Sequence, residues 1–154
     1  METCAFRQQN FPAHYSRDSG FQANTRLGSI EQAADVVYKQ FYVLNMGSGI
    51  LIGNPPADSP DSQIIEDSIK TALTDARDQQ ILPSGLTEFL TTALPTYCEN
   101  KSQTAFLKNL ESNIKLGVKI SQTVQKTIQS NFEALQKKNT QGSAFKGTQA
   151  MNTV

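Results

Sequence analysis

The stretch GSGILIGNPP, Gly47 to Pro56, decides the fold class of this chain. Residues 49–53 are apolar and continuous, without the alternation of a half-exposed strand, and such a run is typical of a strand covered on both faces. Asn54 and the two prolines end the run, because the residue before a proline is pushed out of helical geometry. We therefore predict one clear buried strand at about residues 49–53, followed by a polar turn.

Helical patterns dominate the rest of the chain. Apolar residues at helical spacing predict helices that begin after Ser29, near Ser59, at Thr87 and after Ser102. The three serines are suited to accept hydrogen bonds from free N–H groups at helix starts. Pro95 should kink or end the third helix, because proline lacks the N–H that continues a helix.

The pattern contains too few strands for a sheet. Residues 1–28 look irregular, with a possible short strand at Phe11–Tyr15. A single buried strand must pair with something. Either its partner strands lie in an N-terminal part before Met1, or the chain is a small helical protein and the strand is misread. We favour the first, which makes this an α/β chain.

The composition narrows the class of function. Lys and Arg together equal Asp and Glu, 14 each, and the zero net charge argues against a protein built to bind nucleic acid or an anionic membrane. No run approaches the roughly 18 apolar residues of a membrane helix, and the N-terminus lacks the apolar core of a signal peptide. We expect a cytoplasmic protein in which Cys4 and Cys98 are reduced, because neither has a CxxC partner.

Two asparagines are the candidate site residues. Asn54 lies at the C-terminal end of the predicted strand, where open α/β sheets bind ligands, although turn chemistry alone also accounts for it. Asn113 lies beside the apolar stripe of the last helix, where an amide must find partners or face a polar cavity. One histidine, His14, is too few for a His-based metal cluster, and the sequence has no nucleophile elbow, phosphate loop or HExxH motif.

Four segments of the chain resemble those of one known family. Residues 11–20, FPAHYSRDSG, resemble its FPAFYxRxSG segment, and residues 49–56, GILIGNPP, resemble its GVLVANPIP strand and turn. Residues 86–90, LTEFL, resemble its VTPFLL, and residues 112–117, SNIKLG, resemble its NNARLG. The family is that of pseudouridine-5'-phosphate glycosidases, also described as pseudouridylate synthases or indigoidine synthase A-like proteins, and the resemblance is to its C-terminal portion.

The resemblance implies a fold and a reaction. The fold would be the C-terminal part of a three-layer α/β/α domain, and the enzyme would be a homotrimer. Family members cleave the C-glycosidic bond of pseudouridine 5'-phosphate reversibly to uracil and ribose 5-phosphate. A lysine forms a Schiff base with the ring-opened sugar, which is useful because a C-glycosidic bond has no heteroatom leaving group to protonate. A glutamate moves the proton, and an aspartate holds Mn²⁺.

The resemblance also implies roles for single residues. Asn113 matches the asparagine that reaches the family's active site from the C-terminal helix, so it is the candidate catalytic residue, and Asn54 is the candidate substrate-binding residue. Three positions depart from the family pattern: His14 stands where the family has an aromatic residue, Gly53 where it has alanine, and Phe106 where it has asparagine. The implied organisation is residues 1–122 as the glycosidase-like part, 123–138 as a helical extension and 139–154 as a disordered tail.

The largest departure is at the N-terminus. Glu2-Thr3 matches the ET of the family's LETxGVPVxGY segment, so the nucleophilic lysine and the metal-binding aspartate are expected before Met1. We therefore expect this chain to lack a metal ligand for Mn²⁺ and to be inactive alone. Two alternatives remain: a non-enzymatic truncated product that associates with full-length subunits, or a natural protein that is longer than this chain.

Overall fold

The computed structural model of the chain describes residues 1–15, 17–56 and 62–149. The chain divides into two compact units, one formed by Met1–Ser29 with Ser48–Gly117 and one formed by Ile30–Gly47 with Val118–Val154. Among the described residues, none of the helices has the length and apolar character needed to span a membrane.

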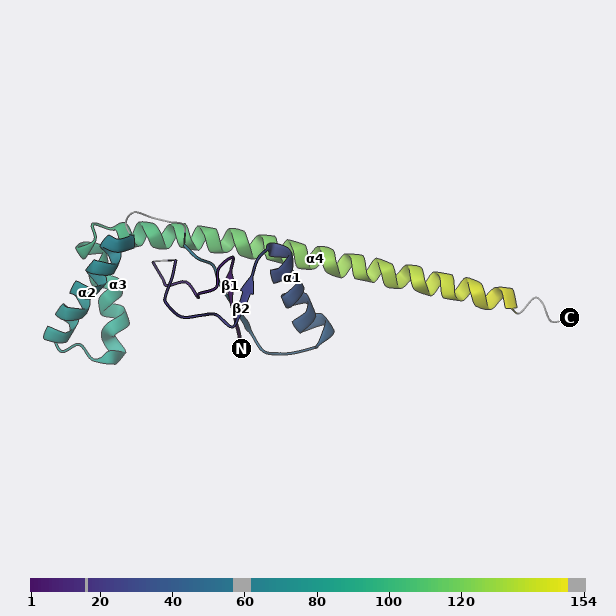
Figure 1. Cartoon of the computed structure of the whole chain (residues 1–154), viewed down its shortest axis with the longest axis horizontal. Coiled ribbons are helices and arrows are strands. Elements are labelled where there is room, and N and C mark those ends of the chain that lie inside the picture. Colours follow the sequence, from purple (N-terminus) through teal and green to yellow (C-terminus); the bar gives the residue numbers. More distant parts are fainter. Residues whose placement is uncertain (16, 57–61, 150–154) are drawn as a thin grey trace. The chain divides into compact units, whose positions relative to one another are not determined.

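A three-stranded parallel sheet lies in the first unit (Figure 1). Strand β1 (Glu2–Phe6) is central, with β2 (Thr25–Leu27) on one side and β3 (Ile50–Gly53) on the other. In this register Cys4 is opposite Ile52 of β3. Because both ladders are parallel, the carboxyl ends of the three strands meet at one edge of the sheet.

The strand predicted at residues 49–53 is confirmed as β3, but two expectations around it were wrong. Its partner is β1 of the same chain, and residues 1–28, expected to be irregular, contain β1 and β2. β1 includes Glu and Ala, which are weak strand formers, and it is held by hydrogen bonds from neighbours on both sides. The strand expected at Phe11–Tyr15 does not form, and its Pro12 has no N–H to donate to a ladder.

Helices make up most of the described chain, and all four predicted from periodicity are confirmed. The predicted cap Ser59 lies outside the described residues. The helical elements, in chain order, are α1 (Ile30–Tyr38), the π-helical turn η1 (Lys39–Val43), α2 (Ser62–Asp78), the 3₁₀ turn η2 (Pro83–Gly85), α3 (Leu86–Tyr97) and α4 (Lys101–Gln149).

Three expectations about helix ends differ from the structure. Ser102 was expected to cap the last helix, but α4 begins at Lys101 and the Ser102 hydroxyl makes no hydrogen bond to a described residue. Pro95 was expected to kink or end the third helix, but it lies inside α3, which ends at Tyr97. A proline in the last turn removes only one backbone hydrogen bond, so its cost there is small. Residues 139–149, expected to be disordered, continue α4, because adding a residue to an existing helix is far easier than nucleating one. Residues 150–154 lie outside the described residues.

Helices α2 and α3 pack against each other in the first unit and lie side by side in Figure 1. The hydroxyl of Ser68 on α2 donates to the backbone carbonyl of Tyr97 on α3 at 3.3 Å, and the Tyr97 hydroxyl donates to the Asp75 carboxylate. These bonds join the two helices beside their shared core. The core cluster consists of Ile65, Leu94 and Cys98, with Tyr15, Ile69 and Ala105 packed against it.

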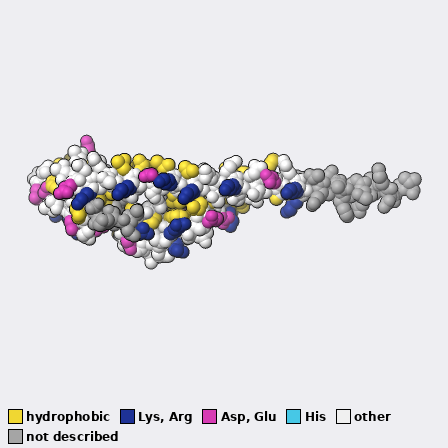
Figure 2. All heavy atoms as spheres, turned by 90° about the horizontal axis from the view of Figure 1, so that it is seen from above, with side chains coloured by type: hydrophobic (Ala, Val, Ile, Leu, Met, Phe, Trp, Pro, Cys, Tyr) yellow, Lys and Arg dark blue, Asp and Glu magenta, His cyan; other side chains and the backbone are white. Residues whose placement is uncertain are grey.

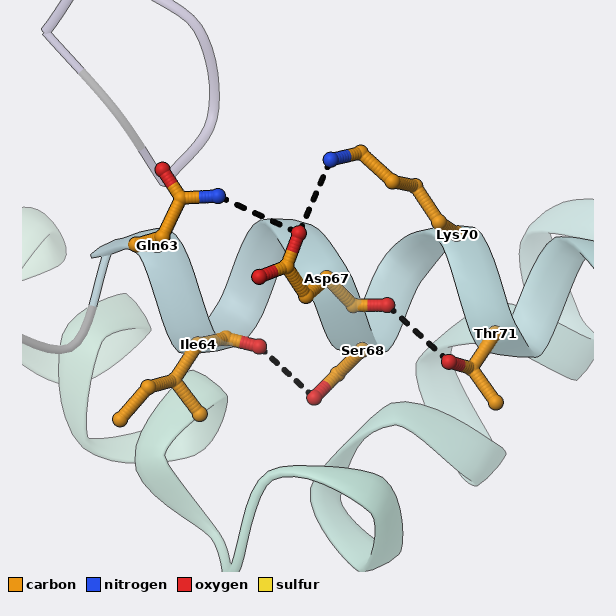
Figure 3. A network of polar contacts seen from close by, with 6 residues as sticks. All are labelled: Gln63, Ile64, Asp67, Ser68, Lys70 and Thr71. Carbon is orange, nitrogen blue, oxygen red and sulfur yellow. Dashed lines mark hydrogen bonds and ion pairs between the residues drawn. The ribbon is translucent and has the colours of Figure 1, made fainter.

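The polar face of α2 is satisfied within the helix itself (Figure 3). Asp67 accepts hydrogen bonds from Lys70 at 2.9 Å and from Gln63 at 3.2 Å, and these bonds hold the pKa of its carboxyl below the usual range. The Ser68 hydroxyl also donates to the carbonyl of Ile64 at 2.8 Å, which allows this polar side chain to be buried. Asp67 and Lys70 therefore stay on the solvent side of α2.

The second unit is described by itself. Its buried apolar residues are Ala33, Ala34, Ile120 and Val124. Of the apolar residues whose spacing predicts the first helix, Ala33 is buried, but Phe41 and Leu44 are exposed. They follow the start of η1, and a π-helical turn rotates later side chains away from the α-helical register.

Candidate functional site

The two candidate asparagines are in direct contact. The Asn54 side chain, just after β3, donates from Nδ2 to Oδ1 of Asn113 on α4 at 3.0 Å. The same Nδ2 donates to the hydroxyl of Ser112, also at 3.0 Å. The sequence predicted each asparagine separately, and the fold brings together two residues that are 59 positions apart.

This hydrogen bond leaves one acceptor and one donor unused on the two side-chain amides. An asparagine side chain has two N–H donors and one carbonyl acceptor with two lone pairs. Among the described residues, Oδ1 of Asn54 and Nδ2 of Asn113 have no hydrogen-bond partner. The pair therefore presents one acceptor and one donor, and a bound molecule can bond to both.

The pair lines a cavity of about 420 Å³ in the first unit. The described lining contains no Asp, Glu, Lys or Arg, and His14 is its only titratable side chain. Such a cavity favours a neutral molecule over an anion, since no cation is present in its wall to pair with one. The lining residues are Phe11, Pro12, Ala13, His14, Leu51, Ile52, Gly53, Asn54, Pro56, Phe106, Asn109, Leu110 and Asn113.

One wall of the cavity is a loop segment that α4 holds in place. Nδ2 of Asn109 donates to the carbonyl oxygen of His14 at 3.1 Å, and the Ser19 hydroxyl donates to the carbonyl oxygen of Phe11 at 2.6 Å. Sequence reasoning missed Asn109. Its spacing of four residues from Asn113 places both amides on one face of α4 and was a usable signal.

The three positions that depart from the family pattern meet at this cavity. His14, Gly53 and Phe106 all line it, and the rings of His14 and Phe106 lie 6.1 Å apart between centroids. At Gly53, a Cβ would lie 2.6 Å from Cδ of Pro12 and 2.7 Å from Cε2 of Phe11. The glycine thus makes room for the loop that forms the wall.

The cavity also explains why β3 is not covered on both faces as predicted. Leu51 is 43% exposed, and it lines the cavity together with Gly53, two residues further on the same face of the strand. The face of the strand that carries Leu51 opens towards the site, so the continuous apolar run reflects a partly open wall. The expectation of two covered faces was wrong at this residue.

The titratable groups around the site have structural roles. The N–H of Gly20 and the side-chain amide of Asn10 hold the pKa of Asp18 below its usual range and stabilise the loop that follows the cavity wall.

The free thiols Cys4 and Cys98 are both buried, which confirms the prediction that they are not paired. The described residues contain no group of three or more His, Cys, Asp or Glu side chains able to hold a metal ion, so they do not fit a manganese site.

Residues 1–123 match the family described as "Indigoidine synthase A like protein". Three curated relatives are named pseudouridine-5'-phosphate glycosidase. The protein from Caldanaerobacter subterraneus subsp. tengcongensis is 33% identical over 123 residues, which cover 79% of this chain and 40% of the relative. The Sorangium cellulosum protein is 33% identical over 118 residues, which cover 75% of this chain and 37% of the relative. The Legionella pneumophila protein is 32% identical over 125 residues, which cover 80% of this chain and 40% of the relative.

A solved structure shows the same fold. The prealnumycin C-glycosynthase AlnA, in complex with ribulose 5-phosphate, matches 82% of this chain and 42% of its own chain with a TM-score of 0.70 at 19% identity. This match confirms the predicted α/β fold class, with a parallel sheet and mostly helical content. The chain spans about 40% of the length of the curated relatives it matches. On these matches, the chain belongs to the indigoidine synthase A-like family, whose curated relatives are named pseudouridine-5'-phosphate glycosidases.

Proposed function

We propose that this chain forms the C-terminal part of a pseudouridine-5'-phosphate glycosidase, which cleaves the C-glycosidic bond reversibly to uracil and ribose 5-phosphate. The observation that carries the proposal is the contact between Asn54 and Asn113 in a neutral cavity, in a chain whose relatives carry that name. The proposed location is the cytoplasm.

The two amides suit the uracil part of the substrate better than its phosphate. Uracil is neutral and carries carbonyl and N–H groups, which can bond to the donor of Asn113 and the acceptor of Asn54. No Lys or Arg lines the described cavity, and the nearby Arg17 guanidinium is bonded to the carbonyl oxygen of Pro56 at 3.2 Å, so the wall itself offers no counter-charge to a phosphate. In this proposal Asn113 is the catalytic residue, and Asn54 both binds substrate and positions Asn113.

The covalent chemistry belongs to the complete enzyme in this proposal. No segment of this chain matches the family's lysine-bearing segment, and the described residues do not fit Mn²⁺. When bound, the metal would assist in holding the phosphate-bearing substrate. The residues of this chain would orient the uracil and exclude water from it.

The activity of the chain alone can be measured directly. We expect no release of uracil above the uncatalysed rate when the purified 154-residue chain is incubated with pseudouridine 5'-phosphate and Mn²⁺. Chromatography of the products measures the release. Turnover at an enzyme-like rate would contradict the division of roles proposed here.

The role of Asn113 is tested in a chimera, in which residues 1–122 replace the matching part of the Caldanaerobacter glycosidase. We expect N113A to lower kcat roughly 100-fold, because a group that touches the reacting molecule is lost. The free energy of unfolding should change by less than about 1 kcal/mol, since the side chain is exposed. K108A, at an exposed position of the same helix, is the control and should keep full activity. A loss of folding with unchanged turnover per folded molecule would assign Asn113 a structural role.

A second candidate function is association with complete glycosidase subunits without catalysis. Leu107, Leu110 and Ile114 follow helical spacing on α4 and are exposed, and Figure 2 shows hydrophobic side chains at the surface between charged ones. Helix faces of this kind are buried in stable oligomers, which also favours the predicted homotrimer. Light scattering should give a trimer mass for the chain, and a complete glycosidase should co-purify with it. A monomer that captures no glycosidase would exclude this function.

A further inference from the structure

A second and larger cavity lies in the first unit, among α2, α3 and the first turns of α4. Its volume is about 650 Å³. An apolar cavity of roughly 150 Å³ already binds benzene, so this one has ample room for a substituted aromatic ring. The lining residues are His14, Tyr15, Ile69, Thr87, Leu90, Thr91, Leu94, Pro95, Ser102, Gln103 and Phe106.

The wall of this cavity is apolar with a few neutral polar groups. Its described lining contains no Asp, Glu, Lys or Arg. Burial, and then the nearby Cys98 thiol, raise the pKa of Tyr15, so its hydroxyl stays protonated at neutral pH. The rings of Tyr15 and Phe106 and the aliphatic side chains of Leu90 and Leu94 supply most of the apolar lining, and Tyr15 packs against the core cluster that contains Leu94. The lining therefore suits a neutral molecule with an apolar body.

Ser102 adds an independent sign that a ligand binds here. Its side chain is only 2% exposed, yet its hydroxyl makes no hydrogen bond to any described residue. The backbone N–H of Ser102 is bonded to Sγ of Cys98 at 3.3 Å, so only the hydroxyl is left over. Among the described residues, every fully enclosed side-chain oxygen has a hydrogen-bond partner. The Ser102 hydroxyl has none, so it is not fully enclosed, and it opens onto the cavity that Ser102 lines. Buried hydroxyls normally have a partner, and a bound molecule would supply one.

We propose that this cavity binds a small neutral aromatic molecule that carries one hydroxyl or carbonyl group, with its ring against Phe106 and its polar group bonded to Ser102. The proposal does not depend on the glycosidase reaction. His14 and Phe106 also line the cavity of Asn54 and Asn113, so the two cavities share a wall. A ligand in one cavity therefore contacts the rings of His14 and Phe106, which also border the other cavity.

The test titrates the full chain with phenol and follows the methyl signals of Ile69, Leu90 and Leu94 by NMR. We expect saturable shifts, and contacts between phenol protons and these methyl groups. Toluene should bind at the same place, and benzoate should not, because its charge would be buried without a partner. Equal binding of benzoate, or shifts that never saturate, would overturn the proposal.

S102A separates the hydrogen bond from the ring contact. It should weaken phenol binding about fivefold, the value of one ordinary hydrogen bond, and leave toluene binding unchanged. The melting temperature should not fall, since the hydroxyl has no partner to lose within the described chain. An equal loss for phenol and toluene would contradict the assigned role of Ser102.

Filling the cavity provides the second variant. T91F places a ring in the cavity and should abolish phenol binding, while T92F changes the next residue of the same helix, outside the lining, and should leave it intact. Circular dichroism checks that both variants fold, and L90F replaces T91F if T91F does not. Unchanged phenol binding in the filled variant would overturn the proposal, as would contacts showing that a second copy of the chain fills the cavity instead.

Discussion

Gly53 is the residue at which the strand backbone and the loop of the site come closest. A Cβ at this position would lie 2.6 Å from Pro12 and 2.7 Å from Phe11, closer than real Cβ atoms approach such neighbours. Both neighbours line the cavity of the asparagine pair. The missing side chain therefore sets the position of that wall.

G53A is expected to lower the free energy of unfolding by about 1–3 kcal/mol, because the ring of Phe11 or the strand must move to admit the methyl group. Urea denaturation measures the loss. G49A is the control, since a Cβ at Gly49 meets nothing within 4 Å, and it should change stability by less than about 0.5 kcal/mol. Equal losses in the free energy of unfolding for G53A and G49A would show that Pro12 and Phe11 leave room for a side chain at residue 53.

The hydrogen bond between Asn54 and Asn113 is tested by a double-mutant cycle. N54A, N113A and the double variant should show a coupling energy of about 0.5–1 kcal/mol, since the amides bond directly at 3.0 Å at an exposed position. Chemical denaturation of the four proteins supplies the values. Additive effects, with no coupling, would show that the two side chains do not meet in solution.

At the scale of the element, α4 contains a glycine that no packing requires. A Cβ at Gly117 would meet nothing within 4 Å, and glycine in a helix interior costs roughly 0.5–1 kcal/mol relative to alanine. G117A should therefore raise the free energy of unfolding by about that amount. Gly20 gives the opposite control, because its φ of +78° is unfavourable for any side chain, and G20A should be destabilising by about 1 kcal/mol. A loss of stability in G117A would indicate a contact on that face of α4.

At the scale of the whole molecule, the two cysteines report the opening of the first unit. Cys4 in β1 and Cys98 after α3 are 0% and 1% exposed. Both thiols should react slowly with a thiol reagent in the native protein, and two equivalents should react at once in denaturant. A single fast-reacting thiol in native conditions would mean that one of these regions opens separately.

The Cys4 thiol makes stability depend on pH. Burial, and then the nearby Glu2 carboxylate, raise the pKa of Cys4 above its usual value. The folded chain therefore binds this proton more tightly than the unfolded chain, so stability is retained below about pH 8.5 and falls as the pH rises through the folded pKa. Thermal melts between neutral and alkaline pH should show this fall, and C4A should reduce it. An identical pH dependence in C4A would exclude Cys4 as its source.

Local patterns in the sequence are enough to predict the helices, the strand β3 and the family. Helical spacing of apolar residues is a local property, so α1, α2, α3 and α4 could be predicted from nearby residues alone. The apolar run of β3, ended by two prolines, is equally local. The roles of Asn54 and Asn113 could be proposed one at a time, that of Asn54 from its place after the strand and that of Asn113 from the resemblance to the family.

Which residues contact one another depends on the folded chain. Strands β1 and β2 were missed, since a central strand and a three-residue edge strand are stabilised by partners distant in sequence and not by their own composition. The hydrogen bond between Asn54 and Asn113 and the close approach at Gly53 join segments far apart in the chain. The cavity onto which Ser102 opens is likewise lined by distant segments. Hydrogen bonding and packing act at a few ångströms, and only the folded chain sets those distances.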